Sequence, residues 1–196
     1  MDKSDIFDQL SDEIHQCKQC DLFKTRTNPV VGEGSLDADL FFIGEAPGFN
    51  EDKRGRPFVG RAGAILDELL QSIDLKRSDI FIANILKCRP PNNRNPTKTE
   101  INLCTHFLER QLEIVNPKII IPMGSFSSAY IFSKYDLPFS KISEVHGKLF
   151  TKNTLYSNLR IIPMYHPAVA TYNPNKISVL LEDINKVKQY IISKSV

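Results

Sequence analysis

The sequence contains no apolar run that approaches the roughly 20 residues needed to span a membrane. Its first segment, MDKSDIFDQLSDEIHQC, is acidic and amphipathic and has no apolar core, which excludes a secretion signal there. Repeats, low-complexity tracts and long linkers are also absent from the 196 residues. We therefore expect a single domain, residues 1–196, that stays in the cytoplasm, does not bind membranes and acts as a monomer.

Cysteine is scarce, with four copies. Cys17 and Cys20 form a Cys-x2-Cys pair, and Cys88 and Cys104 follow with fifteen residues between them. Because cytoplasmic thiols stay reduced, a metal centre explains this set better than disulfides do. One tetrahedral ion or one cluster can use all four thiolates. The spacing leaves zinc and a [4Fe–4S] cluster open, and Cys104 also fits as a small core residue.

The net charge of +2 does not by itself indicate a nucleic-acid partner. Basic residues are nevertheless concentrated in two loops, one within residues 53–61 and one within residues 84–98. The second loop has no acidic residue, and its basic residues are Lys87, Arg89, Arg94 and Lys98. This distribution favours a local phosphate-contacting face, although ordinary solvated loop charges explain it equally well.

Short apolar runs alternate with amphipathic stretches along the chain. Runs rich in β-forming residues predict four buried strands, at 39–46, 80–85, 118–124 and 160–165. Apolar residues at helical spacing predict helices over 62–73, 101–115 and 177–191, and a capping box at Thr97-Lys98-Thr99-Glu100 opens the second. The alternation predicts an α/β fold, a three-layer α/β/α sandwich around a central, mostly parallel four-stranded sheet.

In a sheet of this kind, ligands bind where loops leave the carboxyl ends of the strands. The loops at those positions read GEAPGFNED, NILKCRPPNN, GSFSS and HPAVATYNP. The chemically unusual residues of the chain lie in these loops. We therefore expect the functional site at this edge of the sheet.

Together these loops resemble those of family 4 uracil-DNA glycosylases, the iron–sulfur branch of that superfamily in bacteria and archaea. The matching motifs are Gly44-Glu45-Ala46-Pro47-Gly48 with Glu51-Asp52, Gly55-Arg56-Pro57-Phe58-Val59-Gly60, Asn84-Ile85-Leu86-Lys87-Cys88-Arg89-Pro90-Pro91 and His166-Pro167-Ala168. The resemblance covers residues 15–192. It implies a monofunctional DNA-repair enzyme that flips uracil out of DNA and hydrolyses its N-glycosidic bond, releasing free uracil and leaving an abasic site. It also implies a [4Fe–4S] cluster on Cys17, Cys20, Cys88 and Cys104, with the N-terminal helix inside the same domain.

An enzyme that removes uracil must recognise the Watson–Crick edge of the extruded base. Asn84 ends a predicted strand, and its amide can accept from uracil N3–H and donate to O4, which cytosine does not match. Phe58 resembles the family residue that stacks on the base, although core packing would also explain it. The resemblance completes the uracil-binding set with Glu45, Ala46, Pro47, Gly48, Glu51 and His166.

His166 precedes a proline, which restricts its backbone and helps to aim its ring. The resemblance implies that His166 donates to uracil O2, where negative charge grows as the bond breaks. The first loop has no aspartate to activate water, so Glu45 and Glu51 are the nearest candidates. We expect a largely dissociative reaction, with three histidines left in structural roles: His15, His106 and His146.

One loop departs from the family pattern. Family members commonly follow His-Pro-Ala with a Leu-Arg pair that wedges into the DNA helix, whereas this chain has Thr171 and Tyr172 there. Tyr172 is therefore the predicted wedge, and Arg89 and Arg94 are predicted to contact single- or double-stranded DNA. A related branch that bonds covalently to DNA through a loop histidine is disfavoured, because residues 89–96 contain no histidine.

Two other functions are compatible with parts of the sequence. A glycosylase of broader specificity, acting on hypoxanthine or thymine mismatches, usually lacks a residue like Glu45 and an asparagine like Asn84. A non-catalytic iron–sulfur protein that binds DNA has no need for Phe58, Asn84 and His166 together. Uracil excision is therefore the favoured interpretation.

Overall fold

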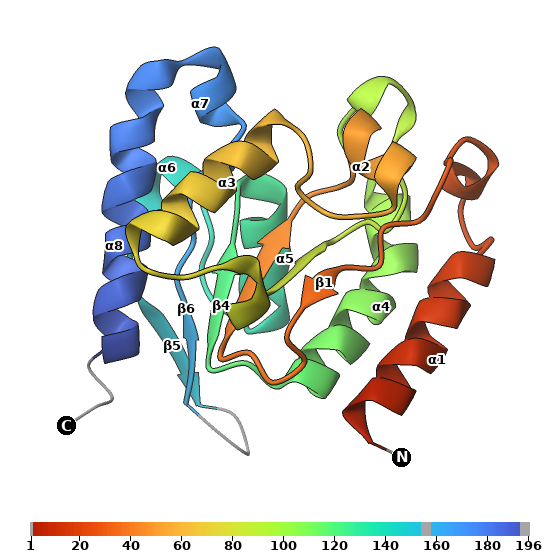
Figure 1. The fold of residues 1–196 in the computed structure, drawn as a ribbon, viewed down its shortest axis with the longest axis horizontal. Coiled ribbons are helices and arrows are strands. Elements are labelled where there is room, and N and C mark those ends of the chain that lie inside the picture. The colour runs from red at the N-terminus through yellow and green to blue at the C-terminus, as the bar shows by residue number, and fades with distance from the viewer. Residues whose placement is uncertain (1, 154–157, 193–196) are drawn as a thin grey trace.

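Six strands form one sheet in residues 2–153 and 158–192, the part of the chain that the computed structural model describes (Figure 1). The strands are β1 (Glu33–Gly34), β2 (Leu40–Gly44), β3 (Phe81–Asn84), β4 (Ile119–Pro122), β5 (Phe150–Asn153) and β6 (Asn158–Ile161). Their order across the sheet is β1-β3-β2-β4-β6-β5.

The four predicted strands form the parallel centre of this sheet, in the order β3, β2, β4, β6. The expectation of only four strands was wrong, because β1 and β5 pair antiparallel at the two edges. Neither edge strand has a continuous apolar run. β1 has two residues, and alternate residues of β5 are exposed, so both lack the signal that identified the buried strands.

Eight α-helices accompany the sheet in the described residues. They are α1 (Lys3–Gln16), α2 (Phe49–Arg54), α3 (Arg61–Ser72), α4 (Lys98–Val115), α5 (Ser125–Lys134), α6 (Ile142–Val145), α7 (Val169–Tyr172) and α8 (Ile177–Ile192). The predicted α3, α4 and α8 are confirmed. The capping box of α4 is present, with Thr97 accepting from the Glu100 amide and the Glu100 carboxylate accepting from the Thr97 amide.

Three of the expected loops instead contain short helices, namely α2, α5 and α7. α5 begins at Ser125, shortly after β4, in the segment GSFSS, which was expected to be a loop. Serines interrupt the apolar spacing of this helix, which explains why the sequence pattern did not reveal it.

Alternate side chains of the central strands face two separate cores. Phe41 and Ile43 pack in the core that α1, α4 and α5 cover, whereas Leu40 and Phe42 pack in the core beneath α3 and α8. These two helix layers with the sheet between them confirm the predicted α/β/α sandwich (Figure 1). No helix in the described ranges is long and apolar enough to cross a membrane.

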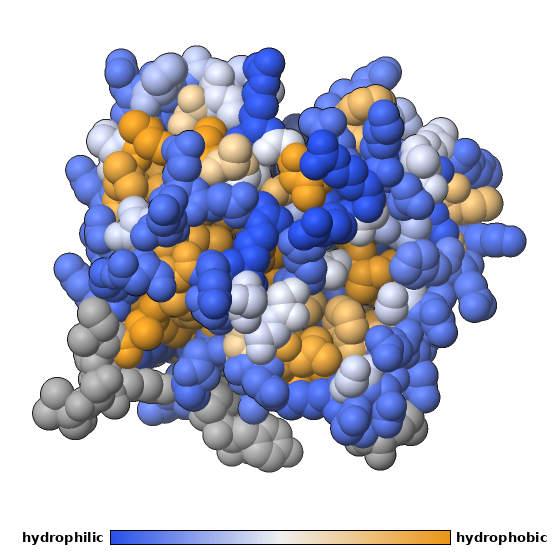
Figure 2. Space-filling view, in the orientation of Figure 1, coloured by the Kyte–Doolittle hydropathy of each residue, from blue (hydrophilic) through white to orange (hydrophobic). Residues whose placement is uncertain are grey.

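The carboxyl ends of the parallel strands gather the loops that carry the motifs. α2 and α7 lie at this end of the sheet, at the top of Figure 1. In Figure 2 the upper outline of the molecule dips between these two regions. Gly124, after β4, has a φ of +92° and lies against His166, where an added Cβ would be 3.1 Å from the histidine Cβ. The fold therefore brings the ends of β2, β3, β4 and β6 around one position.

Candidate active site

A cavity of about 380 Å³ opens at the carboxyl edge of the sheet, within the size range of ligand pockets. All eight residues predicted to bind uracil line it: Glu45, Ala46, Pro47, Gly48, Glu51, Phe58, Asn84 and His166. Five further residues complete the lining: Ala62, Pro90, Asn93, Arg94 and Ala168. The structure therefore collects loops from four separate parts of the chain around one pocket, which we call the base pocket.

Asn84 is the last residue of β3 and lies opposite Gly44 of β2 in the parallel register. It is buried, and its side-chain amide makes no hydrogen bond to any residue that the structure describes. A Cβ on Gly44 would overlap both Asn84 Oδ1 and the ring of Phe58. Glycine at this position therefore lets the amide and the aromatic ring meet in the base pocket.

Phe58 has a φ of +51°, a left-handed conformation that is rare for a bulky side chain. Its ring stacks on the His166 ring, with centroids 5.5 Å apart and planes 26° apart. Glu51 Oε1 accepts from the amides of Val59 and Gly60, at 2.9 and 2.8 Å. The carboxylate of Glu51 thus helps to hold the segment that carries Phe58.

The protonation of His166 follows from one backbone contact. The Ala168 amide donates to His166 Nδ1 at 3.1 Å, so Nδ1 is the acceptor and the ring proton lies on Nε2. Burial lowers the pKa of His166 to about 4, with the nearby Glu51 carboxylate acting in the opposite direction. At neutral pH the ring is therefore an uncharged hydrogen-bond donor.

The two predicted acidic residues differ in their surroundings. Glu45 follows β2 directly and lines the base pocket, and burial raises the pKa of its carboxyl group. Glu51 already uses Oε1 to hold two backbone amides. A carboxyl group with a raised pKa accepts a proton more readily, so Glu45 is better suited than Glu51 to activate water.

All four cysteines line a second, apolar pocket, which we call the thiol pocket, together with Ile14, Leu22 and Phe107. Cys17 and Cys20 follow α1, Cys88 follows β3, and Cys104 lies in α4. Two donors point at the sulfur atoms. Arg26 donates to Cys88 Sγ at 3.1 Å, and the Lys87 amide donates to Cys104 Sγ at 3.3 Å.

Burial raises the pKa of the Cys104 thiol to about 12 and also raises the pKa values of Cys88 and Cys20. An apolar pocket of this kind favours neutral thiols until a positively charged centre binds and deprotonates them. Within the described ranges, no group of three or more His, Cys, Asp or Glu side chains is arranged to hold a metal ion. The cluster therefore stays a prediction.

Lys87 lies between the two pockets and is fully buried. Its ammonium donates to the Asn84 carbonyl at 2.9 Å and to Gln111 Oε1 at 2.6 Å. Burial lowers the pKa of Lys87 to about 8, against the effect of Cys104 and Cys88. The interpretation of Lys87 as part of a phosphate-contacting face was wrong, because a fully buried ammonium cannot reach DNA.

The family model of the uracil DNA glycosylase superfamily matches the sequence over residues 31–189. The chain belongs to this superfamily. It is 46% identical over 190 residues to a type-4 uracil-DNA glycosylase of Sulfurisphaera tokodaii, covering 96% of this chain and 86% of that protein. Type-4 enzymes of Saccharolobus solfataricus (47%, covering 98% and 89%) and Archaeoglobus fulgidus (45%, covering 92% and 90%) are also similar. The predicted resemblance to family 4 is confirmed.

Of the three residues predicted to touch DNA, Arg94 lines the base pocket, and the side chains of all three have different surroundings. Arg89 donates to Asn93 Oδ1 at 2.7 Å, and its guanidinium lies 5.2 Å from the ring centre of Phe49, which is 57% exposed. Arg94 makes a two-pronged ion pair with Glu100, at 2.9 and 2.5 Å. Tyr172, at the end of α7, is 89% exposed.

Several residues at the site were not predicted from the sequence. Pro90 and Asn93 line the pocket from a tight turn in which Asn92 and Asn93 have positive φ values of 55° and 53°. The dipeptides Pro-Pro and Asn-Asn are a turn signal that could have indicated this shape. Phe49 gave no signal, because a single aromatic residue in a loop is usually packed.

We expect His166 to stay neutral down to acidic pH. In ¹⁵N-labelled protein, its Nδ1 should resonate as an unprotonated nitrogen and its Nε2 as a protonated one from about pH 8 to about pH 5. Titration should occur only near its pKa of about 4. In an unfolded chain the histidine pKa is about 6.5, so between about pH 6.5 and about pH 4 the unfolded chain binds a proton that the buried ring does not. The free energy of unfolding should therefore decrease as pH falls through this range.

The signals are assigned by their loss in His166→Gln. In this variant the free energy of unfolding, measured with urea, should decrease less between about pH 6.5 and about pH 4 than it does in the natural protein. A His166 ring that is protonated at pH 6 would contradict the neutral-donor geometry.

Proposed function

We propose that this protein removes uracil from DNA by hydrolysing the N-glycosidic bond, in base excision repair of deaminated cytosine. The observation that carries the proposal is the convergence of Phe58, Asn84 and a neutral His166 in one pocket. The similarity to type-4 uracil-DNA glycosylases supports it. The substrate is uracil-containing DNA, the products are free uracil and an abasic site, and the protein acts as a monomer within a single domain.

Recognition of uracil rests on the Asn84 amide and the Phe58 ring. The flipped base lies against Phe58, while the Asn84 carbonyl accepts from N3–H and its NH₂ group donates to O4. The Ala46–Gly48 segment encloses the base from the β2 side. Cytosine presents a donor where uracil presents O4, so the same amide rejects it.

Catalysis rests on His166. As the bond between C1′ and N1 breaks, its electron pair stays on uracil, and negative charge collects at O2. The Nε2–H group of His166 donates to O2 and stabilises this charge without transferring the proton. Water then adds its oxygen to C1′ and gives up a proton, for which Glu45 is the best-suited acceptor and Glu51 the second candidate.

A [4Fe–4S] cluster is our proposal for the thiol pocket, held by Cys17, Cys20, Cys88 and Cys104. The support is that all four sulfurs line one apolar pocket and that two N–H donors address them, as expected around cluster sulfurs. Such a cluster would cross-link α1, the segment after β3 and α4.

Contact with DNA is assigned to Arg89, Arg94 and Tyr172. Arg89 lies beside the exposed ring of Phe49, so this pair can hold a backbone phosphate and a neighbouring base. Arg94 can contact a phosphate while Glu100 orients it, because 42% of its side chain is exposed. The solvent-exposed side chain of Tyr172 is suited to fill the gap that the flipped base leaves in the DNA stack.

The decisive test is single-turnover excision on oligonucleotides that contain uracil, hypoxanthine or a thymine mismatch. Alkali then cuts the DNA only where a base has been removed. We expect product at uracil alone. His166→Ala should slow this excision by roughly 10²–10³-fold, the scale for losing one oxyanion donor, and leave DNA binding nearly unchanged.

Asn84→Asp is the matched test of specificity, since a carboxylate cannot donate to O4. It should reduce uracil excision at an unchanged melting temperature. A fully active His166→Ala variant would remove the proposed catalytic role. Product at hypoxanthine or thymine would indicate the broader glycosylase, and no product at any base would indicate a protein that only binds DNA.

The cluster predicts yellow-brown protein with about four irons per chain. Cys104→Ser should lose iron and melt at a lower temperature, because the energy of binding at a buried metal site is also folding energy. Iron content, visible absorption and melting temperature measure the three effects. Colourless protein that holds stoichiometric zinc and is active would overturn the assignment.

Arg89→Ala should weaken binding to uracil-containing and normal DNA equally, because phosphate contacts carry no base information. It should also reduce the slope of log affinity against log salt by about one unit.

Arg110→Ala is the control for Arg89, since Arg110 is ion-paired with Glu13 on α1. Its loss should leave the salt slope unchanged. A defect of Arg89→Ala that is confined to uracil-containing DNA would instead place Arg89 in base recognition. In the same set, Tyr172→Ala should impair excision from duplex DNA more than from single strands.

A further inference from the structure

We propose that Arg77, which lies outside the base pocket, is the positioning residue that holds Phe58 in its base-stacking conformation. This inference rests on the proposed uracil excision and adds a residue to it. Arg77 belongs to a short turn (Arg77–Asp79) between α3 and β3, and no motif of the sequence includes it.

Phe58 is held in a conformation that its own side chain disfavours. With a φ of +51°, it lies in the left-handed region, which a bulky residue adopts only where its surroundings impose it. Its carbonyl group also lies so close to Gly63 of α3 that an added Cβ there would overlap it. Contacts on both sides of Phe58 must therefore supply the constraint.

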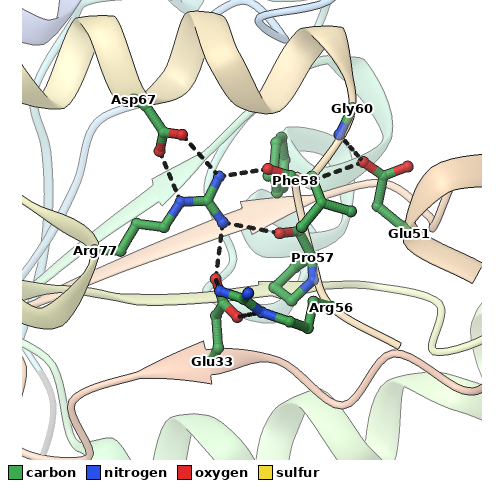
Figure 3. A network of polar contacts seen from close by, with 9 residues as sticks. Glu33, Glu51, Arg56, Pro57, Phe58, Gly60, Asp67 and Arg77 are labelled. Atoms are coloured by element: carbon green, nitrogen blue, oxygen red, sulfur yellow. Dashed lines mark hydrogen bonds and ion pairs between the residues drawn. The ribbon is translucent and has the colours of Figure 1, made fainter. Parts of the chain in front are cut away.

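Arg77 supplies the constraint on the carbonyl side (Figure 3). Its guanidinium donates to the carbonyl of Phe58 and, at 3.0 Å, to the carbonyl of Pro57. On the opposite side, the Glu51 carboxylate accepts from the amides of Val59 and Gly60. In residues 57–60, the carbonyl groups of the first two residues thus bind a cation, and the amides of the last two bind an anion.

The guanidinium of Arg77 is itself fixed by two carboxylates. Glu33 of β1 accepts from Nη1 at 2.8 Å, and Asp67 of α3 accepts from Nε at 2.7 Å and from Nη2 at 3.3 Å. The Arg77 side chain is only 22% exposed, so solvent screens these contacts weakly. Arginine fits this position because its planar fork can serve two carbonyls and two carboxylates at once, whereas lysine has three donors on one atom.

The consequence for the site is specific. Phe58 presents its ring to the base pocket and to His166, whereas Arg77 does not line that pocket. Loss of Arg77 should therefore disturb stacking on the base and leave the His166 donor in place. Stacking acts on the bound base before and during bond cleavage, so its loss raises KM more than it lowers kcat.

The test compares Arg77→Lys with Arg56→Lys. Arg56 also binds Glu33, at 2.7 and 3.3 Å, but its guanidinium donates to none of the carbonyls of residues 57–60, which makes it the matched control. Arg77→Lys should raise KM for uracil-containing DNA, and Ki for free uracil, about tenfold, as for losing a hydrogen bond to a charged group. Its single-turnover rate at saturation should stay within about threefold. Arg56→Lys should change neither constant.

Two further measurements separate positioning from general stability. Amide exchange at Val59 and Gly60 should accelerate in Arg77→Lys and not in Arg56→Lys. In a double-mutant cycle, Phe58→Ala and Arg77→Lys should be strongly non-additive in KM, because both remove the same stacking contact. If Arg77→Lys does not fold, Asp67→Asn replaces it, since it removes one anchor of Arg77 without changing any residue of the segment that carries Phe58.

Additive effects of Phe58 and Arg77, or equal effects of Arg56→Lys and Arg77→Lys, would overturn the inference. Natural protein that does not excise uracil would contradict the proposed function instead. In that case, unchanged amide exchange at Val59 and Gly60 in Arg77→Lys would still count against the positioning role.

Discussion

The parallel pairing of β2 with β3 and β4 is the constraint on which both pockets depend. Its register sets Gly44 against Asn84 and Ile43 against Pro122, so the chain leaves all three strands at the same level. Because Gly44 has no side chain, the Asn84 amide and the Phe58 ring can occupy the space beside it. A shift of one residue would turn Asn84 toward the other face of the sheet and separate these groups.

The thiol pocket lies on one face of the sheet, whereas the base pocket lies at its carboxyl edge and takes Phe58 from the other face. The four cysteines pack against the core that α1 and α4 cover, whereas Phe58 belongs to the core under α3 and α8. Lys87 is the direct link between them, because its backbone addresses Cys104 and its ammonium addresses the carbonyl of Asn84. One buried side chain, three residues after β3, therefore joins the thiol pocket to the backbone of Asn84.

The sequence predicts the parallel centre of the sheet from local apolar runs, and eight residues of the base pocket from motifs that resemble those of family 4. Buried strands are continuous apolar runs, and the pocket residues lie in compact motifs at the strand ends. The edge strands β1 and β5 and the helix α5 have no such pattern. Lys87 was misplaced because burial of a charge depends on partners, such as Gln111, that are distant in the sequence. The donor state of His166 and the role of Arg77 likewise depend on contacts that form only in the folded chain.

The order of the two pockets along the chain separates them in time during synthesis. Cys104 lies ahead of β4, β6 and His166, so a chain still on the ribosome carries every residue of the thiol pocket before it has its histidine donor. Domains are built from the N-terminus onward, and their early parts are exposed while later parts are added. The thiols are thus synthesised first, and the base pocket is completed only when residues 166–168 follow them.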